Sequence, residues 1–180
     1  YLALTGDGTN RGAAYQTVTT IETSTEHALT IVIARGPVTL KVGSTQGADD
    51  YIAETALDEG THSLTLTPTG NFTIQFENTR SYQALVTSVA VESAGVMTIP
   101  APWVTADLGL LRYYQSGDVI FVAAGKTTDK IGYQPYKIER RSTTSWSVVK
   151  YIPEDGPFNT INTGPITIAS DLLTGDVTLT

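Results

Sequence analysis

The stretch "ALTIVIARGPVTLKV", residues 28–42, decides the fold class of the chain. Apolar side chains occupy every second position on both sides of the turn signal "RGP": Leu29, Ile31 and Ile33, then Val38, Leu40 and Val42. Successive side chains of an extended strand point to opposite faces, so this period of two places one face in a core and the other toward solvent. The stretch therefore predicts two β-strands separated by a turn.

The same alternation returns in "HSLTLT", residues 62–67, and in "NFTIQF", residues 71–76. Turn-forming clusters separate the strands at intervals of about 8 to 12 residues, a spacing typical of sandwiches and barrels. These clusters are "GSTQGADD", "LDEG" and "TPTGN". Threonine and valine, which favour strands, are abundant. We therefore expect an all-β protein in which residues 1–100 form an N-terminal, jelly-roll-like β-sandwich domain.

A change of organisation is expected near Pro100. Pro100 and Pro102 cannot both lie in a central strand, because proline lacks the N–H that a sheet requires. Beyond them, residues 106–117 are expected to hold one helical turn, and "DVIFVAAG", residues 118–125, predicts a strand buried on both faces. We interpret residues 101–180 as a β-meander or a partial, propeller-blade-like segment.

The second half contains a predicted hairpin. Its strands are "PYKIERR" and "SWSVVKY", separated by residues 142–144, and the polar residues 125–134 before it are interpreted as a loop. Two further short strands, "GPITIA" and "GDVTLT", are predicted after it. Both chain ends fall inside alternating runs, so we expect the 180 residues to be part of a longer polypeptide.

Composition argues against several classes of function. The chain has 18 acidic and 11 basic residues and a net charge of −7, which disfavours sequence-independent binding to phosphates, so no direct nucleic-acid contact is expected. It has no cysteine, which excludes disulfides and thiolate metal sites. No apolar run approaches the roughly 18 residues of a membrane span, so we expect a soluble protein.

Catalytic constellations are not recognisable in the sequence. The two histidines, His27 and His62, lack the neighbouring ligands of a zinc site, and no Gly-x-Ser-x-Gly nucleophile elbow is present. His62 alternates with Leu64 and Leu66 and is predicted to face the edge of the core or a neighbouring strand. The adjacent acidic pairs lie in turns, where carboxylates bond to local backbone, rather than in the arrangement of a glycosidase: Asp49 with Asp50, Asp58 with Glu59, and Glu154 with Asp155. We expect no enzyme, and a glycan hydrolase or lyase is kept as a third hypothesis.

Two kinds of ligand fit parts of the sequence. The acidic loops "GDGTNRG" and "QGADD" have the oxygen-rich composition of a structural calcium site, although their spacing is not that of an EF-hand, and no other cofactor or metal is indicated. Aromatic rings can stack on sugars. Tyr133 and Tyr136 flank a loop, so they are predicted to be exposed and are the candidate sugar contacts, whereas Trp146 alternates with Val148 and is predicted to be buried.

The charged triplet Glu139, Arg140 and Arg141 ends the first strand of the predicted hairpin. Arginine forks suit carboxylates, so we expect an ion pair that holds blades or subunits together. Its candidate partners are Asp118, Glu154 and Asp155.

The order of four segments in the second half resembles a segment of large structural proteins from tailed bacteriophages and prophages. The segments are "LRYYQSGDVIFVAAG", "QPYKIERR", "TSWSVVKYIPEDGPF" and "TGDVTLT". These proteins are similar in kind to tail tubular or nozzle proteins, which form rings below the portal and are built around β-propeller blades. The resemblance covers residues 110–180. In the first half, "RGPVTLKVGS" and "GTHSLTLTPTG" look like the β-sandwich insertion that such proteins carry, and residues 126–134 exceed the usual short link.

The resemblance implies a non-enzymatic part of a virion tail or head–tail assembly, present in the host cytoplasm during assembly. Its implied partners are other copies of itself and other virion proteins. No catalytic residue carries over, and the residues that match the motif or flank it are implied to be structural: Asp118, Glu139, Arg140, Arg141, Trp146, Asp155 and Gly156. A carbohydrate-binding module that attaches to a cell-surface glycan is the alternative hypothesis.

Overall fold

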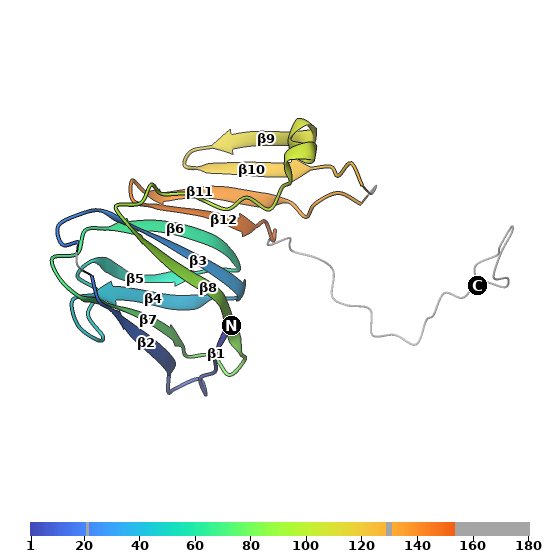
Figure 1. Ribbon diagram of the computed structural model, residues 1–180. Helices are drawn as coiled ribbons and strands as arrows, with labels where there is room; N and C mark the ends of the chain where they lie inside the picture. Colours follow the sequence, from blue (N-terminus) through green and yellow to red (C-terminus); the bar gives the residue numbers. More distant parts are fainter. Residues whose placement is uncertain (21, 129–130, 154–180) are drawn as a thin grey trace, which may run out of the picture.

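The computed structural model describes residues 1–20, 22–128 and 131–153 of the chain (Figure 1). Within these residues the chain forms twelve strands and one short 3-10 helix, η1. In chain order they are β1 (Leu2–Leu4), β2 (Gly12–Val18), β3 (His27–Arg35), β4 (Val38–Gly43), β5 (Ile52–Leu57), β6 (Gly60–Leu66), β7 (Phe72–Asn78), β8 (Ala84–Ser93), η1 (Thr105–Leu110), β9 (Leu111–Ser116), β10 (Val119–Ala124), β11 (Tyr136–Ser142) and β12 (Ser145–Lys150).

The first eight strands pair in a nested, antiparallel order. β1 pairs with β8, β2 with β7, β3 with β6 and β4 with β5. The four pairs are divided between two sheets, which contain β1-β8-β3-β6 and β2-β7-β4-β5. Eight antiparallel strands nested in this way over two sheets form a jelly roll. The predicted all-β, jelly-roll-like sandwich is confirmed.

The core lies between the two sheets. The stretch 28–42 supplies one strand to each sheet, because β3 and β4 lie on opposite sides of the turn at residues 36–37. Its predicted inward side chains are all buried, and burial of each contributes roughly 1.5–3 kcal/mol: Leu29, Ile31, Ile33, Val38, Leu40 and Val42. Residues from β6 and β7 complete the packing, among them Leu64, Phe72 and Phe76.

The last four strands form an antiparallel meander that continues the first sheet. β9, β10, β11 and β12 are neighbours in chain order, and β12 pairs with β6 of the sandwich. The result is one eight-stranded sheet in the order β1-β8-β3-β6-β12-β11-β10-β9, and its meander half projects beyond the four-stranded sheet (Figure 1). The proline segment near Pro100 connects β8 to η1. The meander is therefore observed, and its interpretation as a propeller blade stays a prediction.

Three local predictions can be compared with this meander. The helical turn is present as η1, and β11 and β12 form the predicted hairpin. The prediction that the strand in residues 118–125 is buried on both faces is wrong: in β10 only Val122 and Ala124 are buried, and Ala123 is exposed. The reason is that, as far as the structure describes the chain, the four-stranded sheet ends at β5 and does not extend over β10. The two strands predicted in residues 164–180 lie outside the described residues.

Gly60 is required where the meander joins the sandwich. It begins β6, pairs with Val149 of β12 and has a φ of +146°, a conformation that side chains disfavour. A Cβ there would lie 2.4 Å from the backbone oxygen of Val148.

We expect Gly60→Ala to lower the free energy of unfolding by about 1–3 kcal/mol, because the alanine is strained and pushes β12 away from β6. Denaturant unfolding of the purified chain measures this change. Gly70→Ala is the matched control, since the space around Gly70 is open. Equal stability of the two variants would contradict the role assigned to Gly60.

Candidate functional site

An aromatic groove lies on the meander. It has a volume of about 530 Å³. Its aromatic lining comes from strands β9, β10 and β11 and from the residues that follow β12: Tyr113, Tyr114, Phe121, Tyr136 and Tyr151. Tyr114 lies directly across from Phe121 on the same face of the sheet, and Phe121 packs edge-on against Tyr151, with ring centroids 5.4 Å apart.

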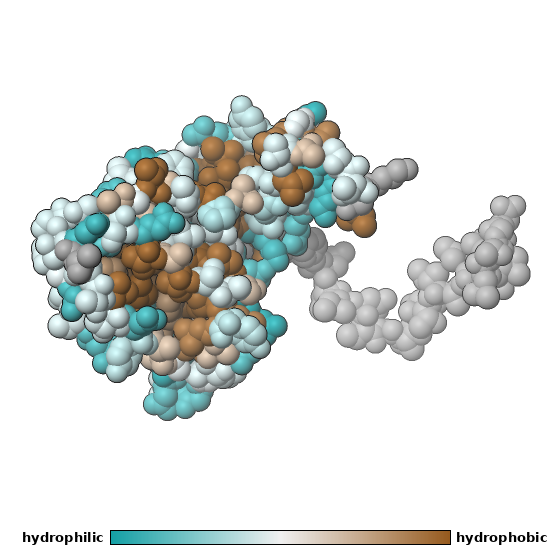
Figure 2. Space-filling view, in the orientation of Figure 1, coloured by the Kyte–Doolittle hydropathy of each residue, from teal (hydrophilic) through white to brown (hydrophobic). Residues whose placement is uncertain are grey.

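The most exposed rings of this groove belong to β9. Tyr113 and Tyr114 are 77% and 72% exposed, and as consecutive strand residues they point to opposite faces of the sheet. Among the described residues, β9 is also the last strand of the eight-stranded sheet, so one of its edges has no neighbouring strand there. Figure 2 shows apolar surface both on the meander and between the sheets of the sandwich. Exposed apolar surface beside an open strand edge marks an interaction site.

The two tyrosines predicted as sugar contacts are held by internal contacts. Tyr133 donates a hydrogen bond from its hydroxyl to Asp107 at 2.9 Å, and Lys126 lies over its ring at 4.9 Å. Tyr136 packs edge-on against Trp103, with ring centroids 5.8 Å apart. Both tyrosines are half-buried, so the prediction that they are exposed is wrong. Of the two, Tyr136 lines the aromatic groove.

Asp107 organises the loop that carries Tyr133. Its carboxylate is buried and accepts hydrogen bonds from the backbone N–H and the hydroxyl of Thr127, at 2.8 and 2.7 Å. The bonds from Thr127, followed by that from Tyr133, hold the pKa of Asp107 below its ordinary value despite burial. Asp107 thus ties η1 to the segment after β10. Sequence reasoning missed it, because a single acidic residue in a short helical turn carries no distinguishing signal.

Of the candidate partners, Asp118 forms an ion pair with the hairpin, and a role of the triplet between blades or subunits stays a prediction. Arg140 lies 3.3 Å from Asp118 and joins β11 to the β9–β10 turn of the same chain. Arg141 donates to the hydroxyl of Thr55 at 3.2 Å and thereby links the meander to β5 of the other sheet. Trp146, directly across from Arg140, is half-buried rather than buried. Glu154, Asp155 and Gly156 lie outside the described residues.

Glu139, the third member of the triplet, lies on the side of the sheet that faces the sandwich core. It is 2.6 Å from the ammonium of Lys137 and accepts a hydrogen bond from Ser147 at 3.2 Å. Ser147 is directly across from His62, which is buried as predicted and donates through Nε2 to the backbone oxygen of Asp58 at 2.9 Å. Burial lowers the pKa of His62, so the ring is neutral at pH 7.

The acidic loops considered for calcium satisfy their carboxylates locally. Asp7 accepts bonds from the side chain and backbone of Asn10, and these lower its pKa to about 2. Asp50 accepts from the backbone and the hydroxyl of Ser44. In the described part of the chain, no three histidine or acidic side chains gather in a group that could hold a metal ion.

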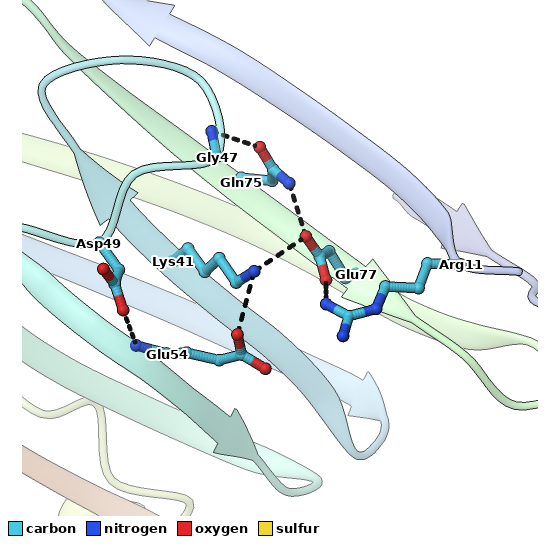
Figure 3. Close-up of polar contacts among 7 residues, drawn as sticks. All are labelled: Arg11, Lys41, Gly47, Asp49, Glu54, Gln75 and Glu77. Carbon is cyan, nitrogen blue, oxygen red and sulfur yellow. Dashed lines mark hydrogen bonds and ion pairs between the residues drawn. The ribbon is translucent and has the colours of Figure 1, made fainter.

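A second polar cluster covers the outer face of the four-stranded sheet (Figure 3). Glu77 of β7 is its centre, with a side chain only 7% exposed, and it is paired with Arg11 and with Lys41, the latter at 3.4 Å. Gln75 donates to the same carboxylate at 2.6 Å. Lys41 also lies 3.0 Å from Glu54, so charge links β7, β4 and β5 to Arg11, the residue before β2.

Each of these charged groups is paired with an opposite charge, which makes it unsuited to proton transfer. Burial raises the pKa of Glu77, but the bonds from Arg11 and Gln75 and the charge of Lys41 outweigh it, and the pKa lies below its ordinary value. The bond to Glu54 raises the pKa of Lys41. The carboxylate therefore stays ionised and the amine protonated near neutral pH, where neither serves as acid or base. The cluster stabilises the sheet and the loop at Gly47, which bonds to Gln75.

Comparison with models of protein families, with curated proteins and with solved structures gives no match for this chain. Among the described residues, no helix has the length and apolar character needed to cross a membrane. The candidate site therefore depends on its own geometry, in which the aromatic groove and the open edge of β9 are the exposed features.

We expect Glu77→Gln to lower the free energy of unfolding by about 1–3 kcal/mol at pH 7, since it leaves Arg11 and Lys41 without their buried partner. The depressed pKa gives Glu77 a stabilising contribution that is present above its ordinary pKa of 4.5 and is lost as the pH falls through its value in the folded protein. The difference in the free energy of unfolding between wild type and variant should therefore shrink as the pH falls below 4.5. Denaturant unfolding at pH 7 and below pH 4 checks both statements.

Glu54→Gln is the control for this experiment, because Glu54 bonds to the same lysine but its side chain is 48% exposed. We expect its effect to stay below about 1 kcal/mol. A Glu77→Gln effect no larger than the control at pH 7 would contradict the central position of Glu77.

Proposed function

We propose that the chain is a non-enzymatic structural component of a tailed-bacteriophage virion, in the tail or at the head–tail junction. The observation that carries this proposal is the projecting meander, whose last strand leaves Tyr113 and Tyr114 exposed beside an open edge. A monomer in water gains nothing from such a surface, whereas a subunit of an assembly buries it against its neighbour.

Two further features support assembly as the function. The jelly roll is a common architecture of viral structural proteins, which is an argument by analogy of fold. The segments that resemble phage structural proteins include β9, β10, β11 and β12, so the resemblance falls on the surface in question. Its matching residues Asp118 and Arg140 form an ion pair that joins β11 to the β9–β10 turn. The partners are other copies of the chain and other virion proteins.

The proposal predicts that the protein is incorporated into particles. Mass spectrometry of purified virions from the phage or induced prophage that encodes the chain should detect it in many copies per particle. Deletion of the coding segment should give particles with incomplete or missing tails in electron micrographs. Particles that lack the protein and are infectious without it would contradict the proposal.

Carbohydrate binding is a second candidate, because the aromatic groove could stack a sugar ring. Here the exposed rings Tyr113 and Tyr114 are better placed than Tyr133, whose hydroxyl is bonded to Asp107. If the groove binds glycans, the chain should bind one glycan class on an array, and Tyr114→Ala should weaken that binding at least about fivefold. Tyr133→Phe is the control and should leave it unchanged. No binding on the array would remove this candidate.

A further inference from the structure

The two edges of the eight-stranded sheet are unequal. β9 closes one end. At the other end β1 is only three residues long and pairs with residues 84–86 of β8. The rest of β8, residues 87–93, pairs with β3 on one side, and no strand among the described residues pairs with its other side. Seven consecutive residues of backbone are therefore open at this edge.

An apolar groove of about 370 Å³ lies beside this open stretch, between the two sheets of the sandwich. Val89 and Val91 of β8 line one side of it, and Ala14 and Val18 of β2 line the other. Val89 is 40% exposed although it points toward the interior of the sandwich. An open strand edge beside an apolar groove is the arrangement that accepts an added strand, whose backbone pairs with the edge while alternate side chains enter the groove.

β9 has the properties of the missing strand. It is six residues long, close to the length of the open stretch of β8, and no strand in the described part of the chain pairs with its outer edge. Tyr113 and Tyr114 point to opposite faces. Whichever face of β9 turns toward the groove, one exposed tyrosine ring lies over it.

Charge also favours this pairing. Arg112 is the second residue of β9, and Glu92 is the last but one of β8. An antiparallel alignment brings the start of one strand to the end of the other, so these opposite charges meet.

We propose that β9 of one copy pairs antiparallel with residues 87–93 of β8 in a second copy, and that Tyr113 or Tyr114 enters the groove between that copy's sheets. The two surfaces differ, so the contact is heterologous and each added copy leaves both kinds of edge free. Repetition produces a ring if the rotation closes and a filament if it does not. This inference rests on the proposed assembly function and specifies the contact.

Sedimentation of the full 180-residue chain over a range of concentrations tests the contact. The wild type should form species larger than a dimer as the concentration rises. Val89→Lys, which places a charge at the accepting edge, and the double variant Tyr113→Lys/Tyr114→Lys, which removes both rings from the donating strand, should each remain monomeric. Val104→Lys is the matched control, because Val104 is exposed outside both edges, and it should assemble like the wild type.

Mixing the two monomeric variants distinguishes this contact from a symmetric one. The Val89→Lys chain retains a normal β9 and the tyrosine variant retains a normal β8, so together they should form a dimer of one copy each and nothing larger. Arg112→Glu and Glu92→Arg should each weaken association about fivefold, and their combination in one chain should restore it.

Three results would overturn the proposal. Wild type that is monomeric at every concentration, with a lower Tm in Val89→Lys, would assign the groove to another segment of the same chain. Variants that assemble normally, or fail to form the mixed dimer, would place the contact elsewhere. If the protein is nevertheless found in virions, the assembly function stands and only the strand pairing fails.

Discussion

The pairing between β12 and β6 is the interaction on which the position of the whole meander depends. Five residues of each strand align, from Ser145 opposite Leu64 to Val149 opposite Gly60. Without this ladder β6 would be an edge of the sandwich, and the meander would be a separate sheet with no fixed position. Lys150 adds an ion pair with Glu59 at the end of the ladder. One set of backbone hydrogen bonds thus converts a jelly roll into a sandwich with an extended sheet.

The two sheets of the sandwich expose different kinds of surface. The four-stranded sheet is covered by the charge cluster around Glu77, in which each ion has a partner of opposite sign. The extended sheet instead presents aromatic rings and an open strand. Mutual neutralisation suits a surface that faces water, whereas an uncovered aromatic edge suits one that faces another molecule. The contrast locates interaction on the meander rather than on the outer face of the short sheet.

The fold was largely predictable from the sequence, because a period of two is a strong signal where one face is buried. Leu29, Ile31 and Ile33 follow this period and are all buried. The hairpin around residues 142–144 was likewise predicted and is present. The burial of β10 was not predictable. Its apolar run suits a covered strand, but coverage depends on how far the opposite sheet extends, and the number of strands in that sheet is a tertiary property.

The candidate site was less predictable than the fold. Tyr133 was chosen because it borders a loop, yet its exposure is set by Asp107, 26 positions away. Tyr113 and Tyr114 carry no local sign of exposure, because their strand becomes an edge only through the order of the whole sheet. The pair Arg140–Asp118 was predictable only as one of three candidate pairings, because Glu154 and Asp155 offered the same charge.

The composition of the core has a consequence for the order of folding. Its fifteen-member buried cluster, including Leu4 and Val86 at its limits, contains no residue from the meander. Residues 1–93 can therefore bury their apolar surface before residues 111–150 are available, as happens when a chain leaves the ribosome from its N-terminus. β6 would then be the template on which the meander is added, beginning with β12, the last of its strands to be synthesised. The strands of the meander are thus synthesised from β9 to β12, but they join the sheet in the reverse order, from β12 to β9.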